Sequence, residues 1–437
     1  MPSLRDQVLE ASASRDRVSD AVKALALGLV ILGHGLAWTT TASGTAVNTL
    51  EAAPWLFPLT WLLQILPLFF IVAGDRMRSV ALDPSTDGVR RRVARLVTPT
   101  LPLLLVTIVA AAVIPLFADN AIASAAGVIP VQLLWFLGVY LAAIALCPIL
   151  VRIRRPWHFA AMLLAIGAVD LARVRLWESI GWVNLLLAWL FFVALGMQLP
   201  RLRQVGRGLL AASAIAGLAG AIALVVIGPY SAALISTDAL PGISNLAPPT
   251  IVLVLVGIAQ ASLLLLAWPL LARSLARDSL WVPVAVFSSR AMGMYLLHML
   301  FLAACIGVVL SAGLHPTPLS LAWWLLHAGV LGVAAGMAWW LAPTLITAGS
   351  RVAATARRLL PRTFVASAGR APARAWLALA GVAGLTLLLV SESGVGSSLE
   401  IRVVKGLPYL PAGAVILLVI VAALAMPSTR NAGTVAE

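Results

Sequence analysis

Two ionisable residues in the first apolar segment, Lys23 and His34, have the types and spacing that proton chemistry on an anionic molecule needs. At about 100° and about 1.5 Å per residue, eleven helical residues complete about three turns, so both side chains share one face about 16 Å apart. A cation near a membrane surface can bind a negatively charged carrier molecule that bears the reacting group. An imidazole deeper on the same face can accept a proton. Ionisable groups inside a bilayer are costly and by default indicate function. The alternative is a neutral His34 that bonds to a neighbouring helix.

The composition predicts a polytopic helical membrane protein. Of 437 residues, 62% are hydrophobic and 11% are charged, and the mean hydropathy is +1.02. No soluble domain needs so much apolar surface. The net charge of +14 does not indicate nucleic-acid binding, because the basic residues lie in short patches between apolar segments. Cys147 and Cys305 both lie in apolar runs, and no histidine, cysteine or carboxylate group has metal-binding spacing. We therefore expect no disulfide framework and no metal site.

Apolar windows of about 20 residues predict an all-α bundle of about twelve transmembrane helices. The windows are 21–40, 55–74, 97–117, 130–150, 157–172, 182–199, 209–228, 249–272, 283–309, 321–345, 375–392 and 407–425. The chain shows no convincing internal repeat.

The distribution of basic residues predicts that both termini are cytoplasmic. With this orientation, all but four of the 30 lysines and arginines lie on the inside, as the positive-inside rule requires. The four outside are Arg173, Arg175, Arg402 and Lys405.

An Arg-rich connection suggests a division of the chain into a core and an appended tail. We expect a cytoplasmic N-terminal segment (1–20), a ten-helix core (21–345), an Arg-rich cytoplasmic linker (346–374), two additional helices (375–425) and a cytoplasmic tail (426–437).

A second basic cluster precedes the third apolar window. Arg92 and Arg95 are three residues apart, so they share one helical face, where guanidinium groups can hold phosphate. Basic residues at a helix end are also the ordinary topology signal and bind lipid headgroups. Lys23 at the same membrane face favours convergence of the two clusters on one ligand. Asp20, three residues before Lys23, either pairs with the lysine or caps the helix.

Further polar and aromatic residues could serve a substrate or support the site. Tyr295 and His298 share one face of the ninth segment and bind either a substrate or backbone groups and each other. Trp135 suits a cavity wall or an aromatic belt. Asn245, before Pro248 and Pro249, suits a rigid rim on the outside or plain turn chemistry.

Several short motifs, in order and on the expected membrane sides, resemble the acyltransferase 3 family of integral-membrane O-acyltransferases. The resemblance spans about residues 15–345. The motifs are Arg17-x-x-Asp20-x-x-Lys23 followed by His34, Pro67-Leu-Phe-Phe-Ile-Val-Ala-Gly74, Arg92-x-x-Arg95, Leu134-Trp-Phe-Leu137, and Ser289 followed by Tyr295-Leu-Leu-His298. Asn184 and the Asn245 to Thr250 stretch resemble an actinobacterial-type branch of the family.

The chain departs from the family pattern at two places. Lys23 stands where arginine is usual, which keeps the charge and loses the bidentate fork. Ala73 replaces a common serine and Asp75 a common aromatic residue, so we assign the second-helix segment no role beyond packing.

The resemblance implies a plasma-membrane enzyme that transfers an acyl group, acetyl or another short one, from cytoplasmic acyl-CoA to a hydroxyl of a carbohydrate or glycolipid acceptor. Acyl-CoA, with acetyl-CoA as the expected donor, is a co-substrate, and no permanently bound cofactor is expected. The resemblance implies that His34 is the catalytic residue. It also implies that Lys23, Arg92 and Arg95 bind the phosphates of the acyl donor. His34 acts as general base, with an acyl-histidine intermediate as the less favoured variant. The oxyanion-stabilising group stays open between Tyr295, His298 and a backbone amide.

Two other functions fit parts of the pattern. Twelve helices and intramembrane histidines also suit a proton-coupled transporter or flippase of a glycolipid or small solute, in which Asp170 would be the best relay carboxylate. Few carboxylates lie in the apolar segments, and this counts against a carrier. Lys23 in place of arginine and the altered second-helix motif also leave open a membrane sensor or scaffold without catalysis, for which His34 would be dispensable.

Overall fold

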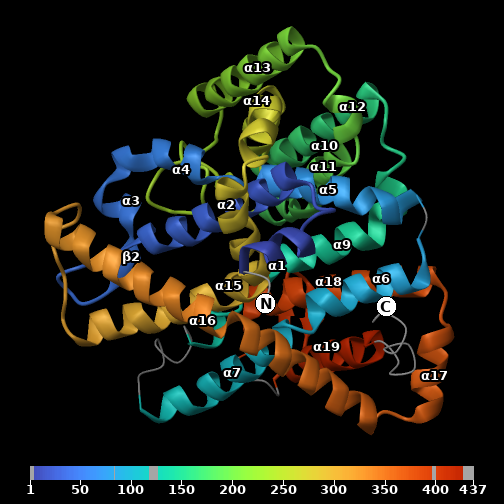
Figure 1. Cartoon of the computed structure of the whole chain (residues 1–437). Helices are drawn as coiled ribbons and strands as arrows, with labels where there is room; N and C mark the ends of the chain where they lie inside the picture. The colour runs from blue at the N-terminus through green and yellow to red at the C-terminus, as the bar shows by residue number, and fades with distance from the viewer. Residues whose placement is uncertain (1–3, 83, 118–125, 396–399, 427–437) are drawn as a thin grey trace. The chain divides into compact units, whose positions relative to one another are not determined.

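The computed structural model describes residues 4–82, 84–117, 126–395 and 400–426. Within these residues, ten helices are long and apolar enough to cross a membrane, and two shorter apolar helices accompany them. A helix satisfies its own backbone donors and acceptors, which the hydrocarbon of a bilayer cannot do. Of the described residues, 77% are helical, and the chain is an all-α, multi-pass membrane protein (Figure 1).

The elements before residue 151 are α1 (Leu4–Ala11), α2 (Arg17–Leu36), β1 (Trp38–Thr40), β2 (Ala46–Asn48), α3 (Thr49–Ala52), η1 (Pro54–Leu56), α4 (Phe57–Leu63), α5 (Leu66–Leu82), α6 (Thr86–Val97), α7 (Thr100–Val113), η2 (Ile114–Leu116) and α9 (Leu134–Leu150). The later elements are α10 (Pro156–Arg175), η3 (Glu178–Trp182), α11 (Val183–Gly196), α12 (Leu199–Leu202), α13 (Arg207–Ile227), α14 (Ile251–Leu275), α15 (Asp278–Ser311), α16 (Leu321–Leu359), α17 (Arg362–Arg370), α18 (Ala373–Ser393), β3 (Arg402–Val404), β4 (Leu407–Tyr409) and α19 (Pro411–Ala425).

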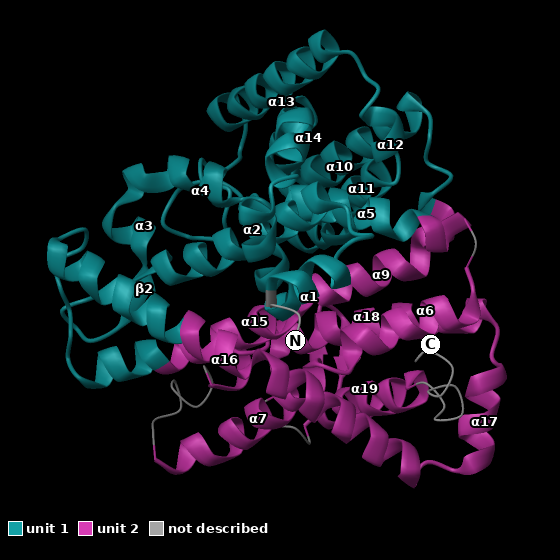
Figure 2. Cartoon of the chain, in the orientation of Figure 1, with its two compact units in different colours: residues 1–78, 150–291, 305–334 teal, residues 79–149, 292–304, 335–437 magenta. Residues whose placement is uncertain are grey.

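The chain forms two compact units (Figure 2). Unit 1 comprises residues 1–78, 150–291 and 305–334, and unit 2 comprises residues 79–149, 292–304 and 335–437. In unit 1, α14 packs against α2, α10, α11 and α13. In unit 2, α6 packs against α18 and α19, the two helices that follow the Arg-rich connection.

Helices α5 and α11 approach each other backbone to backbone in unit 1. A Cβ atom on Gly74 would lie 2.1 Å from the Val193 carbonyl oxygen, and one on Gly196 would lie 1.9 Å from the Ile71 carbonyl oxygen. Each glycine therefore occupies a position where a methyl group has no room. This contact gives Gly74 a packing role.

Gly74→Ala is expected to separate α5 from α11 and to lower the free energy of unfolding by about 1–3 kcal/mol, the usual cost of overpacking. Thermal unfolding in detergent, followed by size-exclusion chromatography, measures the loss. Gly167→Ala in α10 is the matched control, because its Cβ would meet nothing within 4 Å. Equal stability of the two variants would contradict this account of the α5–α11 contact.

The described helices follow the twelve predicted windows, with different ends. Helix α10 extends from Pro156 through Asp170 to Arg175, so the fifth window is one continuous helix. Residues 346–374, predicted as a linker, are mostly helical, because α16 continues to Leu359 and α17 follows. Two short antiparallel hairpins, β1–β2 and β3–β4, were not predicted. After residue 426, the expected C-terminal tail lies outside the described residues.

Candidate functional site

Helix α2 carries both residues of the Lys23–His34 pair without interruption. It begins after Asp16, whose carboxylate accepts hydrogen bonds from the backbone N–H groups of Val18 and Ser19. Asp16 is therefore the N-cap, a position that favours aspartate because its side chain satisfies the free N–H groups of the first turn. The continuous helix supports the predicted shared face, with about 16 Å between the two positions.

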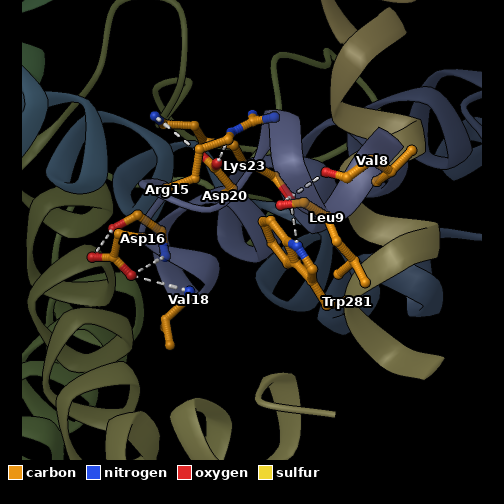
Figure 3. A network of polar contacts seen from close by, with 10 residues as sticks. Val8, Leu9, Arg15, Asp16, Val18, Asp20, Lys23 and Trp281 are labelled. Carbon is orange, nitrogen blue, oxygen red and sulfur yellow. Dashed lines mark hydrogen bonds and ion pairs between the residues drawn. The ribbon is translucent and has the colours of Figure 1, made fainter. Parts of the chain in front are cut away.

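The buried carboxylate of Asp20 lies between two cations (Figure 3). Its Oδ2 atom accepts a hydrogen bond from Arg15 Nε at 2.6 Å, and its Oδ1 atom lies 3.8 Å from Lys23 Nζ. The ion pair is thus present, and the capping role left open for Asp20 belongs to Asp16 instead. A buried carboxylate needs such partners, since an isolated one is strongly disfavoured. The pair restrains the lysine.

The start of α2 and the segment before it are fixed to α15 and to the end of α14 by a second set of contacts. The Trp281 indole N–H donates to Ser12 Oγ at 2.9 Å, and the Arg17 guanidinium lies 5.2 Å from the centroid of the Trp281 ring. Arg17 Nη1 donates to the Leu275 carbonyl at 2.9 Å, and Arg5 pairs with Asp278 at 2.9 Å. These contacts hold the turn that carries Arg15.

The surroundings of Lys23 are more basic than the sequence indicated. Arg15 and Arg76 are both close enough to the Lys23 ammonium to repel it. Arg76 follows Asp75 in α5, and Asp75 also lies within electrostatic reach of Arg76. Unit 1 therefore gathers three cations near the start of α2, together with the carboxylates of Asp16 and Asp20, and anion binding would relieve the repulsion between the cations.

The other end of α2 is held by aromatic stacking and hydrogen bonds. The His327 ring stacks on Trp323 and on Trp38, with centroids 3.7 and 4.3 Å apart. Its Nδ1 atom lies 2.9 Å from the Trp323 carbonyl oxygen and its Nε2 atom 2.8 Å from the Trp38 carbonyl oxygen. Next to His34, a Cβ on Gly35 would lie 2.8 Å from the Leu331 side chain, so α2 and α16 approach closely there. His34 itself is partly buried.

The predicted arginine pair lies on α6, in unit 2. Val89, Val93 and Val97 form the buried stripe of this helix, which leaves Arg95 exposed and Arg92 half-buried. The Arg92 guanidinium lies within electrostatic reach of Tyr140 on α9. Lys23 lies in unit 1, whereas Arg92 and Arg95 lie in unit 2. Convergence of the three residues on one ligand stays a prediction.

The tyrosine and histidine of the ninth apolar segment bond to backbone carbonyls. The Tyr295 hydroxyl donates to the Leu133 carbonyl, and His298 Nδ1 lies 2.8 Å from the Tyr295 carbonyl oxygen. Tyr295 also packs against Phe136, whose ring contacts Trp135 edge to face. This arrangement supports a structural role for Tyr295, while a substrate role for His298 or Trp135 stays a prediction.

Asn245 organises the loop between α13 and α14. Its fully buried amide donates to the carbonyls of Ser231 and Ala233 at 2.6 and 2.9 Å, and its Oδ1 atom accepts from Thr250 Oγ1 at 2.6 Å. With donors and acceptor all engaged in the loop, turn formation is the interpretation that the contacts favour.

The same loop is tied to Asp170 on α10. The buried carboxylate accepts hydrogen bonds from Asn184 Nδ2 at 2.8 Å, from the Ile251 N–H at 2.8 Å and from the Tyr230 hydroxyl at 3.3 Å. Burial raises the pKa of the Tyr230 phenol well above its ordinary value, and the Asp170 charge raises that pKa further, so the hydroxyl stays a donor. The network joins α10, α11, the loop and the start of α14.

Asp170→Asn is expected to lower the free energy of unfolding by about 1–3 kcal/mol, because the new amide N–H groups face donors that the carboxylate had satisfied. The measurement is the melting temperature in detergent, with the exposed loop variant Asp238→Asn as the control. If Asp170→Asn melts like the control, the carboxylate does not hold the loop.

Arg15 and Arg76 were not singled out from the sequence, and His327 was only a weak candidate. Arg15 lies five residues from its carboxylate partner and outside the helix, where no periodic pattern indicates a contact. Arg76 reaches the start of α2 from another helix. His327 is four residues from Trp323, a spacing that favours contact on a helix, although its partner Trp38 is distant in sequence.

Together, these observations define a class: multi-pass helical membrane proteins that place a carboxylate-paired lysine and a histidine on one face of the first long helix. Residues 17–342 match the acyltransferase domain of the acyltransferase 3 family, and the chain belongs to that family. It is an enzyme that transfers acyl groups other than aminoacyl groups. No curated protein and no solved structure shows significant similarity to the chain. Membership of the actinobacterial-type branch stays a prediction.

Proposed function

We propose that this acyltransferase moves an acetyl or other short acyl group from cytoplasmic acyl-CoA to a hydroxyl of an extracytoplasmic or membrane-linked carbohydrate, and that it does so in the plasma membrane. The observation that carries the proposal is the single helix α2. It holds Lys23, restrained by Asp20, eleven residues before His34, within the matched acyltransferase domain.

The dimensions of the donor fit this helix. An extended pantetheine arm spans on the order of 15–20 Å by chain-length reasoning, which is close to the separation of about 16 Å between the two positions on α2. With the nucleotide phosphates at Lys23, and with Arg92 and Arg95 as the further phosphate ligands, the thioester reaches the level of His34.

In the proposed reaction, a neutral imidazole nitrogen of His34 takes the proton of the acceptor hydroxyl as the oxygen attacks the thioester carbonyl. The C–S bond breaks as the tetrahedral intermediate collapses, and the thiolate leaves. The imidazolium proton then goes to the thiolate, which gives an ester and CoA and regenerates the neutral histidine. No step requires a permanently bound cofactor.

In the transporter alternative, Asp170 would be the best relay carboxylate. Three donors engage its carboxylate and join it to a loop. These contacts give the carboxylate a structural role that a relay group does not need.

Transfer of radiolabel tests the proposal. Purified protein in nanodiscs is incubated with [14C]acetyl-CoA, or a longer acyl-CoA, and a carbohydrate-containing envelope extract. We expect label in an ester-linked, base-labile carbohydrate fraction and stoichiometric release of CoA. Transport of a glycolipid without any CoA release would instead identify a carrier.

A further inference from the structure

Arg15 lies outside the first long helix but shares a carboxylate with the lysine at its start. It comes from the turn between α1 and α2, whereas Lys23 comes from the second turn of α2. Asp20, 5% exposed, lies beneath them, and the side chains of Arg15 and Lys23 are 37% and 27% exposed. The carboxylate therefore holds two cations side by side at an accessible position (Figure 3).

The guanidinium of Arg15 has unused binding capacity. Its Nε atom donates to Asp20, and among the described residues its two Nη groups make no hydrogen bond. A guanidinium presents five N–H donors in a fixed fork that matches phosphate, whereas lysine offers a single compact charge. Arg15 thus supplies the bidentate geometry that Lys23 cannot.

The turn that carries Arg15 is fixed by hydrogen bonds. The Arg15 N–H donates to the Ser12 carbonyl at 3.1 Å, and Ser12 Oγ donates to the Val8 carbonyl at 2.6 Å while accepting from Trp281. A charge held in this way loses less conformational freedom on binding than a mobile surface arginine.

We propose that Arg15 and Lys23 together bind a phosphate group of acyl-CoA, with Asp20 as the carboxylate that positions both cations. Arg15 Nη groups hold two phosphate oxygens, and the Lys23 ammonium contacts the same phosphate from the helix side. Arg76 adds to the positive potential around it. This inference rests on the proposed function, because it names the donor-binding groups of the same site.

Equilibrium binding of CoA to the full-length protein in nanodiscs tests this inference. Arg15→Gln is expected to weaken CoA binding by about tenfold or more, as expected for the loss of a charge-assisted hydrogen bond. Arg207→Gln, which removes an exposed arginine at the start of α13, is the matched control and should bind like wild type. Arg15→Gln should also raise KM more for acetyl-CoA than for acetyl-pantetheine, which has no nucleotide phosphates. A folding defect would raise both values alike.

The double variant Arg15→Gln/Lys23→Arg provides a rescue, because an arginine on α2 restores a phosphate-binding fork next to Asp20. We expect it to bind CoA more tightly than Arg15→Gln alone. If Arg15→Gln binds CoA like wild type while wild type binds and cleaves acetyl-CoA, this inference is wrong and the proposed function stands. If wild type neither binds CoA nor cleaves acetyl-CoA, both are wrong.

Discussion

Replacing His34 by alanine is expected to lower kcat by about 10²–10⁴-fold, the range that a positioned general base contributes. The reason is that the acceptor hydroxyl then has no group at this position to take its proton as it attacks the thioester. Binding of CoA should stay within about twofold, because the phosphate-binding groups lie about 16 Å away along α2. Release of CoA from acetyl-CoA, in the presence of the acceptor extract, gives kcat.

His315→Ala is the control for this variant, because His315 is exposed and lies outside the helices. Both variants should elute from size-exclusion chromatography like wild type. Retained turnover in folded His34→Ala would exclude His34 as the base.

Replacing Lys23 by glutamine is expected to raise KM for acetyl-CoA by about tenfold or more and to change kcat less, since a charged phosphate ligand is lost while the reacting groups remain. The Asp20 carboxylate would also lose one of its two cations, so some loss of stability should accompany the effect. Initial rates across acetyl-CoA concentrations separate KM from kcat.

Lys23→Arg tests whether the positive charge at this position, and not the lysine side chain itself, is what binds the donor. It keeps the cation beside Asp20 and adds a fork, so we expect KM at or below that of wild type. An equal rise in KM for Lys23→Arg and Lys23→Gln would show that lysine acts through packing instead of charge.

The helical architecture could be predicted because apolar length reports directly on membrane spanning. Even α10, where the fifth apolar window is shortest, proved continuous. The helix ends were less predictable, since they depend on local partners. Asp16 caps α2, because its carboxylate accepts hydrogen bonds from two backbone N–H groups. Asp20, an aspartate four residues later, does not cap the helix.

Short polar structures were missed where the chain leaves the helices. The β1–β2 hairpin pairs Trp38 with Asn48, and α3 follows it directly. Three-residue strands are too short to give a recognisable alternation of apolar and polar residues. Residues 407–409 fall within the apolar window 407–425, yet they pair with 402–404 as strand β4.

The candidate site shows the same division. The spacing of Lys23 and His34 is a local helical property, and α2 carries both residues on an unbroken helix. Contacts between residues that are distant in the chain left no recognisable pattern in the amino-acid sequence. The Trp281–Ser12 bond joins residues 269 positions apart, and the close approach of Gly74 to Val193 depends on which helices become neighbours.

The two helices after the Arg-rich connection also acquire a structural context. Within unit 2, α18 and α19 both pack against α6, which carries Arg92 and Arg95. Arg357 of α16 donates to the carbonyls of Ala423 and Met426 at the end of α19, where a cation is favoured by the helix dipole. These helices therefore support the arginine-bearing helix.

The side of the membrane on which acetyl-CoA is used is the decisive property, because we propose that the donor phosphates bind at the Lys23 end of α2. The protein is reconstituted into vesicles in a single orientation, which is established by protease access to an N-terminal tag. Acetyl-CoA is then supplied on one side only, with the acceptor extract on both sides. We expect CoA release when acetyl-CoA is on the side of the N-terminus and none when it is on the other side. Turnover with acetyl-CoA only on the opposite side would contradict the proposed donor site at Lys23.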